Sequence, residues 1–180
     1  MDGGGGPALE PAARHGSHDA GYDAFAHAER PRLVRFAWSL TGDVGAAEDV
    51  AQEALIVAWQ RWDEVAGFDR PDVWVRRVVA NRAAGRARRS GRELRANGRW
   101  FGRASAVTVD LGPLDEAFWH AVRLLPDRQA QAVALHYLED RSVADIATVL
   151  GCAEATVKVH LHRGRLALAR TLELTEGGAP

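Results

Sequence analysis

Hydrophobic positions recur every three to four residues along most of the chain, and no long stretch alternates with period two. Leu33, Ala37 and Leu40 follow the spacing i, i+4, i+7, which predicts a helix over about 22–40 that ends at a glycine-containing turn. A second helix is predicted over about 44–62, with its apolar stripe at Ala47, Val50, Ala51, Ala54, Ala58 and Trp62. This periodicity predicts an all-α fold.

A third helix is predicted to begin at Pro71, where the missing N–H costs nothing, and to run to about Arg89. Its inward stripe is Val75, Val78 and Val79. The helical period is then lost in a segment that gathers Gly, Ser and Arg, which predicts a flexible linker between two domains. We therefore expect a disordered tail, a first domain, a linker, a second domain and a short tail at 1–20, 21–90, 91–114, 115–174 and 175–180.

The second domain is predicted to hold four helices, at about 115–125, 128–137, 143–150 and 154–172. Ser142 and Asp145 form a start that resembles a capping box, with Asp in place of the usual Glu or Gln. Gly151 then provides a tight turn before the last helix. A short helix, a glycine turn and a longer helix predict a helix–turn–helix unit.

The composition is that of a globular protein: 180 residues, 47% hydrophobic and 26% charged. The net charge of −1 hides a segregation, because residues 40–69 hold seven acids and one arginine, whereas residues 70–103 hold eleven arginines and two acids. This asymmetry suggests two different partner surfaces. The single Cys152 excludes an internal disulfide. Without an apolar run or signal sequence, we expect a cytoplasmic protein with no membrane contact.

The helix predicted at 154–172 has one apolar side and one exposed, largely basic side. The apolar side is Val157, Leu161, Gly164 and Leu168, and the opposite side is Lys158, Val159, His162 and Arg163. Cations on an exposed helix suit the phosphates and guanine edges of a DNA major groove. An ordinary helical hairpin with a solvated basic side explains the spacing nearly as well.

The helix that begins at Pro71 carries a mixed aromatic and basic side. Trp74, Arg77, Asn81 and Arg88 stack over four turns, and the basic surface is broadened by Arg76, Arg82, Arg86 and Arg89. Aromatic stacking together with amide and guanidinium contacts suits unpaired bases. For any single one of these residues, a solvated helix with Trp74 in the core remains the simpler explanation.

The second helix carries a compact acidic face of Glu48, Asp49, Gln52 and Glu53. These residues lack the spacing of a metal site, and no histidine, cysteine or glycine-rich loop lies nearby in the sequence. They are therefore either solvated or in contact with a basic protein surface. Since no nucleophile–base set, phosphate loop or ligand cluster appears, we expect no enzymatic activity, cofactor or metal.

The stretch LVRFAWSLTGDVGAAEDVAQEALIVAWQRWDEV, followed by PDVWVRRVVANRAAGRARR, resembles domain two of bacterial sigma factors. The later stretch LLPDRQAQAVALHYLEDRSVADIATVLGCAEATVKVHLHRGRLAL resembles their domain four. Two such domains in this order, joined by a linker, resemble the extracytoplasmic-function (ECF) group of RNA polymerase sigma factors, of the actinobacterial type. The resemblance covers about residues 22–172.

The resemblance implies an alternative sigma factor that binds core RNA polymerase and directs promoter recognition, DNA melting and transcription initiation. It implies docking on the clamp helices of the largest polymerase subunit by Glu48, Asp49, Gln52 and Glu53. It implies recognition of the minus-ten element by Trp74, Arg76, Arg77, Asn81, Arg88 and Arg89. Domain four would contact the polymerase flap and recognise the minus-thirty-five element with Thr156, Lys158, Val159, His162 and Arg163. A separate anti-sigma factor is a further partner that the resemblance allows.

The sequence departs from the family pattern at Val159, where many relatives have Ser. This leaves Lys158, His162 and Arg163 to set specificity. The alternative function is a stand-alone helix–turn–helix regulator whose N-terminal helices dimerise or bind a ligand. The acidic face argues against this alternative, because a self-sufficient regulator needs no surface for docking on polymerase.

Overall fold

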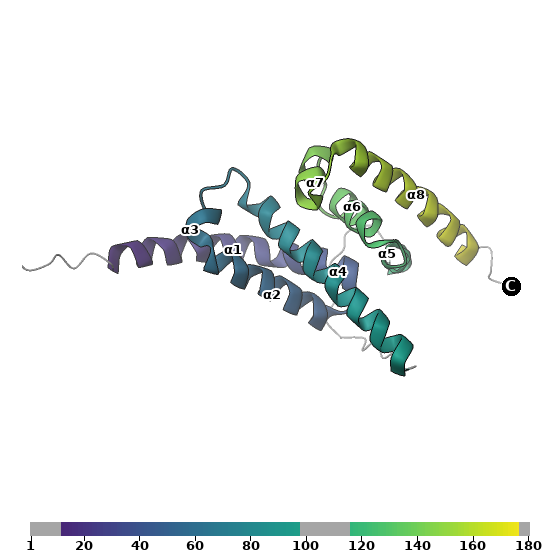
Figure 1. Ribbon diagram of the computed structural model, residues 1–180, viewed down its shortest axis with the longest axis horizontal. Helices are drawn as coiled ribbons and strands as arrows, with labels where there is room; N and C mark the ends of the chain where they lie inside the picture. Colours follow the sequence, from purple (N-terminus) through teal and green to yellow (C-terminus); the bar gives the residue numbers. More distant parts are fainter. Residues whose placement is uncertain (1–11, 98–115, 177–180) are drawn as a thin grey trace, which may run out of the picture.

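The computed structural model of the chain describes residues 12–97 and 116–176, with side chains over 20–86 and 116–173. Eight α-helices make up most of these residues (Figure 1): α1 (Ala12–Thr41), α2 (Val44–Gln60), α3 (Trp62–Val65), α4 (Pro71–Asn97), α5 (Glu116–Arg123), α6 (Asp127–Tyr137), α7 (Val143–Leu150) and α8 (Glu154–Glu176). The described ranges contain no β-strand, and the predicted all-α fold is confirmed. Within them, no helix is both long and apolar enough to cross a membrane.

The first domain consists of the long helices α1, α2 and α4, with the short α3 at the end of α2 (Figure 1). Asp43 caps α2, because its side-chain oxygen accepts a hydrogen bond from the Ala46 N–H at 2.7 Å. All members of the predicted apolar stripe of the second helix are buried. They pack against Leu33 and Phe36 of α1 and against Val79 of α4, which are fully buried as well.

The second domain consists of α5, α6, α7 and α8. Ser142 caps α7 by accepting a hydrogen bond from the Asp145 N–H at 3.1 Å, as the sequence predicts. Gly151 ends α7 with φ of 65°, a left-handed conformation that glycine adopts without a steric penalty. Val157 and Leu161 of α8 are buried on the side that faces α6 and α7. The helix–turn–helix unit is thus present.

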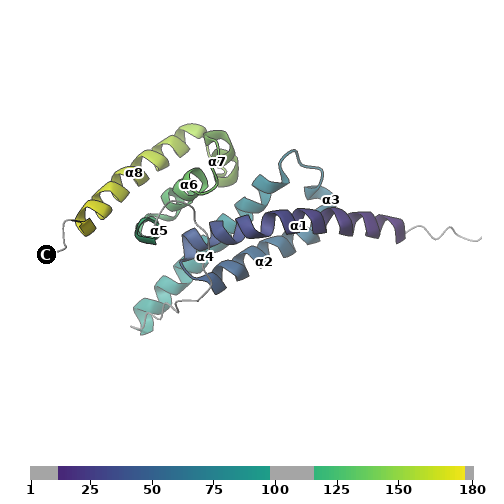
Figure 2. The ribbon, with the colours of Figure 1, turned by 180° about the vertical axis from the view of Figure 1, so that it is seen from behind.

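The two domains pack against each other. α4 lies against α7, and α1 lies against α5 and α6, as Figure 2 shows from behind. A single cluster of buried apolar side chains runs through both domains. At the edge of the interface, the guanidinium carbon of Arg123 lies 4.8 Å from the ring centre of Trp38, in a cation–π contact between α5 and α1.

Three helices extend well beyond their predicted ends. α1 begins at Ala12, inside the segment predicted as a tail, and α8 extends to Glu176, also beyond its predicted end. α4 continues to Asn97, so residues 91–97 are helical and do not belong to the linker. Residues 92–96 are Arg, Glu, Leu, Arg and Ala, and their high helix propensity outweighs the cost of a preceding glycine.

The predicted second helix is interrupted near its end. α2 stops at Gln60, because Arg61 leaves the helical region with φ of −121° and ψ of 21°. α3 then begins at Trp62 and directs the indole into the core, where it is 8% exposed. The indole packs against Tyr22 and Phe25 at ring-centre distances of 5.5 and 5.0 Å. This aromatic cluster explains why the chain turns here instead of continuing as one helix.

Candidate functional site

The outer side of α8 is exposed along two turns. Its exposed residues include all five that the resemblance assigns to the minus-thirty-five element: Thr156, Lys158, Val159, His162 and Arg163. The side chain of Val159 is 44% exposed, although it is apolar. Arg165, which the sequence analysis did not single out, is exposed on the same helix, and its Nε donates to the Tyr137 hydroxyl at 2.9 Å. The arrangement leaves the basic side of α8 open to a partner.

His160 lies at the inner edge of this surface and is half-buried. Burial lowers the pKa of His160 below its ordinary value of 6.5, and the positive charges of Arg128 and Arg163 lower it further. The imidazole is therefore neutral near pH 7. It contributes no positive charge to the side of α8 that carries Lys158 and His162.

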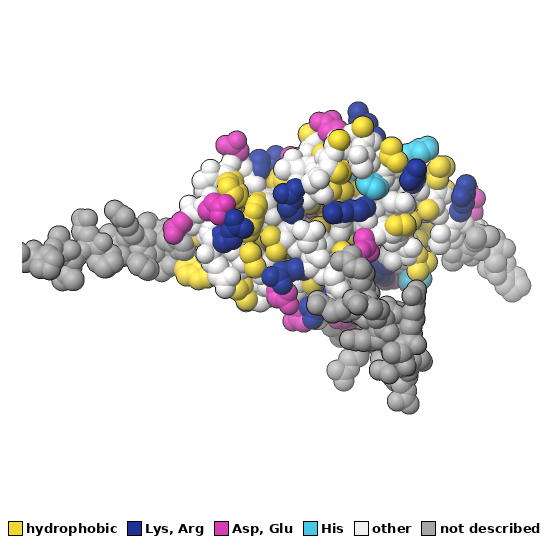
Figure 3. All heavy atoms as spheres, viewed as in Figure 1, with side chains coloured by type: hydrophobic (Ala, Val, Ile, Leu, Met, Phe, Trp, Pro, Cys, Tyr) yellow, Lys and Arg dark blue, Asp and Glu magenta, His cyan; other side chains and the backbone are white. Residues whose placement is uncertain are grey.

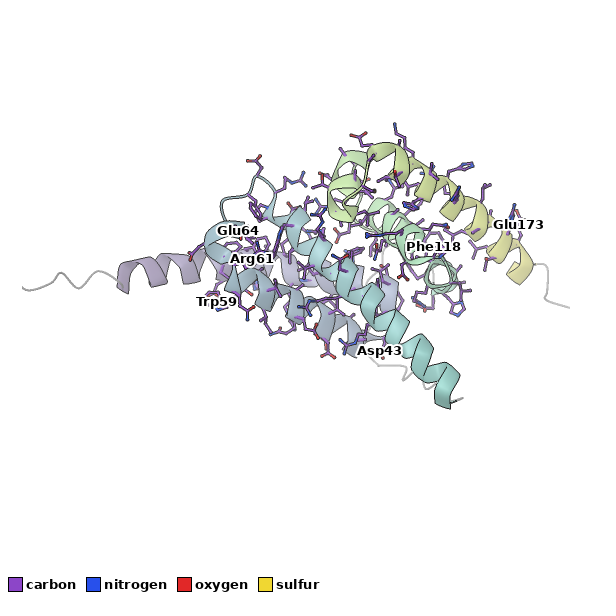
Figure 4. All side chains as sticks on the ribbon, in the orientation of Figure 1. Asp43, Trp59, Arg61, Glu64, Phe118 and Glu173 are labelled. Atoms are coloured by element: carbon purple, nitrogen blue, oxygen red, sulfur yellow. The ribbon has the colours of Figure 1, made fainter. Side chains whose placement is uncertain are left out.

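Trp74, at the start of α4, is half-buried and lies beside the loop that joins α3 to α4. The Phe68 ring is 6.4 Å away, and the Arg61 guanidinium lies 5.4 Å from the centre of the indole. Arg61 also donates to Glu64 at 2.6 Å, and Figure 4 shows both residues at the end of the domain where Trp59 lies, away from Asp43. The indole is held by neighbours on one side and accessible on the other.

The structure does not place all predicted minus-ten residues on one open surface. Asn81 is exposed, as predicted. Arg76 is completely buried, so the expectation that it broadens the exposed basic surface is wrong for this conformation. Arg77 is exposed, but its Nε donates to the Val149 carbonyl of α7 at 3.3 Å. Arg88 and Arg89 belong to α4, and their side chains lie outside the described residues.

Arg76 is buried because it points from α4 into the interface between the two domains. Its guanidinium pairs with Glu29 of α1 at 2.8 Å and with Glu139, which follows α6. Burial alone would lower the pKa of Arg76, but Glu139 and Glu29 raise it overall, so the group stays charged. A buried charge requires such partners, and this one draws them from both domains.

The acidic face of α2 is at the surface, as the sequence predicts. Glu48, Asp49 and Gln52 are exposed and Glu53 is partly exposed. The face is not free of partners, however: Asp49 pairs with Arg86 at 2.7 Å, and Glu53 pairs with Arg82. The charge segregation of the sequence is therefore partly neutralised in space. Exposed pairs of this kind are each worth less than about 1 kcal/mol.

Three further polar contacts link α4 and its flanks to the second domain. Asp72 pairs with Arg141 at 2.7 Å, and Arg70 pairs with Asp145 at 2.8 Å. The side-chain amide of Gln131, which is 2% exposed, donates to the carbonyl oxygen of Ala80 at 2.8 Å. The sequence analysis missed these contacts and the one between Arg76 and Glu139. The partners are 51 to 75 residues apart and share no spacing that would reveal them.

Asp72 shows how strongly these charges are coupled. Burial alone would raise the pKa of the Asp72 carboxyl, but the hydrogen bonds and charges of Arg70 and Arg141 lower it overall. Asp72 is therefore ionised at neutral pH. Figure 3 shows acidic and basic side chains interspersed over this face of the molecule, without one large patch of either sign. Several arginines of the predicted basic surface are thus paired with acidic side chains of the same chain.

Two family models match the two domains separately. Residues 25–93 match sigma-70 region 2, and residues 115–168 match sigma-70 region 4. The ECF RNA polymerase sigma factor SigL of Mycobacterium tuberculosis is 38% identical over 150 residues, which cover 78% of this chain and 82% of SigL. The chain belongs to the ECF group of RNA polymerase sigma factors. It is accordingly an alternative sigma factor, which directs promoter recognition and transcription initiation.

More distant sigma factors match a similar share of this chain. SigW of Bacillus subtilis is 27% identical over 158 residues, which cover 79% of this chain and 84% of SigW. Among solved structures, the sigma factor RpoE of Bartonella quintana, in complex with the anti-sigma factor NepR, is similar with a TM-score of 0.69 and 27% identity. That match covers 84% of this chain and 96% of RpoE. The match to RpoE therefore includes both domains of the present chain.

Proposed function

We propose that this sigma factor docks on core RNA polymerase through the acidic face of α2 and reads promoter DNA with α4 and α8. The observation that carries the proposal is that three surfaces accessible to solvent differ in chemical character. One is the acidic face of α2, another holds Asn81 and Trp74 on α4, and the third is the basic side of α8. A basic protein surface, unpaired bases and duplex DNA are their respective chemical complements.

The minus-ten element would be read by α4 after the duplex opens. Trp74 offers a partly accessible aromatic face for stacking, and the exposed Asn81 offers both a donor and an acceptor to a base edge. Arg77, Arg88 and Arg89 would contact phosphates of the separated strand. In this role Trp74 and Asn81 contribute to DNA melting by binding bases that are no longer stacked.

The minus-thirty-five element would be read as duplex by α8. Lys158 and Arg163 are exposed donors that suit guanine edges and phosphates, with Thr156 and His162 beside them. Val159, at 44% exposure, offers an apolar contact such as a thymine methyl group. Each good base contact of this kind is worth about 1–3 kcal/mol of discrimination.

Polymerase would hold the two domains at separate places. We assign the clamp helices of the largest subunit to the acidic face of α2 and the flap to the second domain. Because its partner polymerase is cytoplasmic, we place the sigma factor in the cytoplasm, without enzymatic activity of its own. Since the similar RpoE was solved with an anti-sigma factor, we also propose a separate anti-sigma protein as a regulator of this chain.

The docking assignment is tested with charge reversal on α2. The double variant Glu48→Arg and Asp49→Arg should lower the affinity for core RNA polymerase at least tenfold, since reversed charges meet a surface of like sign. Glu173→Arg, at an acid that is also exposed but lies on α8, is the matched control for one reversed charge (Figure 4). Affinity is measured by fluorescence anisotropy of the labelled sigma factor. Equal affinity of the α2 variant and the control would overturn the assignment.

A further inference from the structure

We propose that ion pairs between the two domains, of which the central one is buried, form a latch that holds the second domain of the free sigma factor against α4, beside its minus-ten residues. The latch consists of Arg76 with Glu139, Asp72 with Arg141, and Arg70 with Asp145. The inference rests on the proposed function of α4, and it adds a resting state in which that function is blocked.

Arg76 is the centre of the latch. Its side chain is completely buried, and the side chain of Glu139 is only 6% exposed, so their pairing excludes water. Glu29, from α1, pairs with the same guanidinium from within the first domain. Arg76 therefore keeps one carboxylate partner when the domains separate and loses the other. Glu139, in contrast, becomes a solvated surface acid in the separated state.

The latch holds the second domain next to the surface that the proposed function requires, although Asn81 itself stays exposed. Arg70 and Asp72 flank the start of α4, Arg76 is one turn further on, and Arg77 donates to the Val149 carbonyl of α7. Further along the same helix, Gln131 of α6 donates to the carbonyl of Ala80, the residue before Asn81. A DNA strand that contacts Arg77 on this side of α4 has to displace α7.

Promoter recognition requires the two domains to separate. The minus-ten and minus-thirty-five elements lie about 25 base pairs apart, which corresponds to about 85 Å of duplex at a rise of ~3.4 Å per pair. In this structure α4 packs directly on α7, the first helix of the helix–turn–helix unit. One compact molecule cannot read both elements at once, so the packed arrangement is a state that precedes promoter binding.

The chemistry of the latch allows it to open. Arg76 Nη2 and Glu139 Oε1 are buried without a hydrogen-bond partner among the described residues, so part of the desolvation cost is not recovered. A cleft of about 460 Å³ borders the pairs and is lined by further charged side chains, among them Arg32, Arg35 and Asp140. A competing polymerase surface can therefore displace the second domain without breaking either helical domain.

The latch is tested by weakening it from the side of the second domain. Glu139→Gln removes the charge that pairs with Arg76 but leaves the Arg76–Glu29 pair intact. Asp140→Asn is the matched control, because Asp140 is the exposed neighbour and forms no salt bridge with another described residue. Its φ of 50° also suits Asn, which tolerates this region well.

Domain separation is measured by single-molecule energy transfer in the full chain. Dyes are placed at two exposed positions with Ala66→Cys and Ala153→Cys, in a Cys152→Ser background. We expect the parent and Asp140→Asn to give one high-efficiency population, and Glu139→Gln to shift most molecules to low efficiency. Arg141→Gln should shift fewer molecules in the same direction. Identical distributions for Glu139→Gln and Asp140→Asn would overturn the latch, provided that circular dichroism shows equal helicity.

The partial covering of α4 is tested with single-stranded DNA that carries the minus-ten sequence. If only a small fraction of the free chain is open, opening it should strengthen binding about tenfold in Glu139→Gln. Unchanged binding by an opened variant would contradict the covering of α4. Core RNA polymerase added to the labelled parent should also produce the low-efficiency state. If polymerase fails to bind at all, the proposed function fails, whereas the latch between domains would still be judged by the Glu139→Gln distribution.

Discussion

The outer sides of α4 and α8 are both predicted from sequence as basic DNA-reading surfaces, yet the structure treats them differently. On α8, Lys158 and Arg163 point to solvent. On α4, Arg76 is fully buried and Arg77 is bonded to a carbonyl of the second domain. The difference shows that a helical pattern identifies the residues that share a side, whereas the tertiary contacts decide whether that side is available.

The largest expected effect separates two adjacent arginines of α4. Arg76→Ala leaves Glu29 and Glu139 buried without their common partner, and it should lower the free energy of unfolding by about 3–5 kcal/mol. Arg77→Ala removes one hydrogen bond of a mostly exposed side chain and should cost about 1 kcal/mol or less. Urea unfolding followed by circular dichroism measures both. Equal losses would contradict the contrast between a buried and an exposed arginine.

The next prediction separates the two DNA-reading helices in the holoenzyme. Lys158→Ala and Arg163→Ala should each weaken closed-complex formation on duplex promoters by about 1–3 kcal/mol, and DNA that is already melted should rescue the loss only in part. Asn81→Ala should leave upstream binding near normal but reduce opening, because its base contact forms only after melting.

Permanganate footprinting of reconstituted holoenzyme reports promoter opening directly, and a gel-shift assay reports closed-complex formation. If Asn81→Ala opens promoters with unchanged sequence preference, Asn81 is a solvated side chain of α4, and the assignment of base recognition to this residue is wrong. The assignment of duplex recognition to α8 is judged separately, by closed-complex formation of the Lys158→Ala and Arg163→Ala variants.

A smaller effect concerns the pairs that link α2 to α4. Asp49→Asn together with Glu53→Gln releases Arg86 and Arg82, so the free chain should bind duplex DNA non-specifically several-fold more tightly. The log–log dependence of this binding on salt should become steeper by about 1–2, as expected for one or two added phosphate contacts. Asp23→Asn with Glu173→Gln changes the net charge equally at two exposed sites and is the control. If the control variant binds DNA as tightly as the α2 variant, the change in net charge alone explains the effect.

The smallest effect is the pH dependence of the second domain. The lowered pKa of His160 means that the unfolded chain binds its proton more readily than the folded one. Its contribution to stability is therefore complete above pH 6.5 and is lost as the pH falls below that value. His160→Gln should flatten the stability profile between pH 7 and pH 5 in thermal unfolding. An unchanged profile would show that other groups control this range.

Most of the fold could be predicted from the sequence, because local signals determine it. The stripe of alanine and valine in α2, the cap at Ser142 and the glycine turn at Gly151 each act within a few residues, and the structure shows all three. The break at Arg61 could not be predicted, since it depends on Tyr22 and Phe25 receiving the indole of Trp62 from a distant part of the chain.

The candidate site was predictable only in part, for the same reason. The sequence pattern brings Lys158, His162 and Arg163 to one exposed side, and the structure shows this arrangement. The same reasoning placed Arg76 on an exposed surface, because helical spacing considers only residues near in sequence. Glu139, which pairs with Arg76, lies 63 residues away. Asp145 was expected to complete a capping box, but its carboxylate accepts from Arg70 of the first domain instead. Pairing across a domain interface leaves no trace in helical periodicity.

Footprinting of a matched promoter with the free chain and with reconstituted holoenzyme tests the central claim most directly. We predict that the free chain protects neither element, because the two domains are packed together and α7 occupies the Arg77 side of α4. The holoenzyme should protect two regions about 25 base pairs apart, at the minus-ten and minus-thirty-five elements, as a rise of ~3.4 Å per pair requires of separated domains. Protection of both elements by the free chain, without polymerase, would contradict the account and favour a stand-alone regulator.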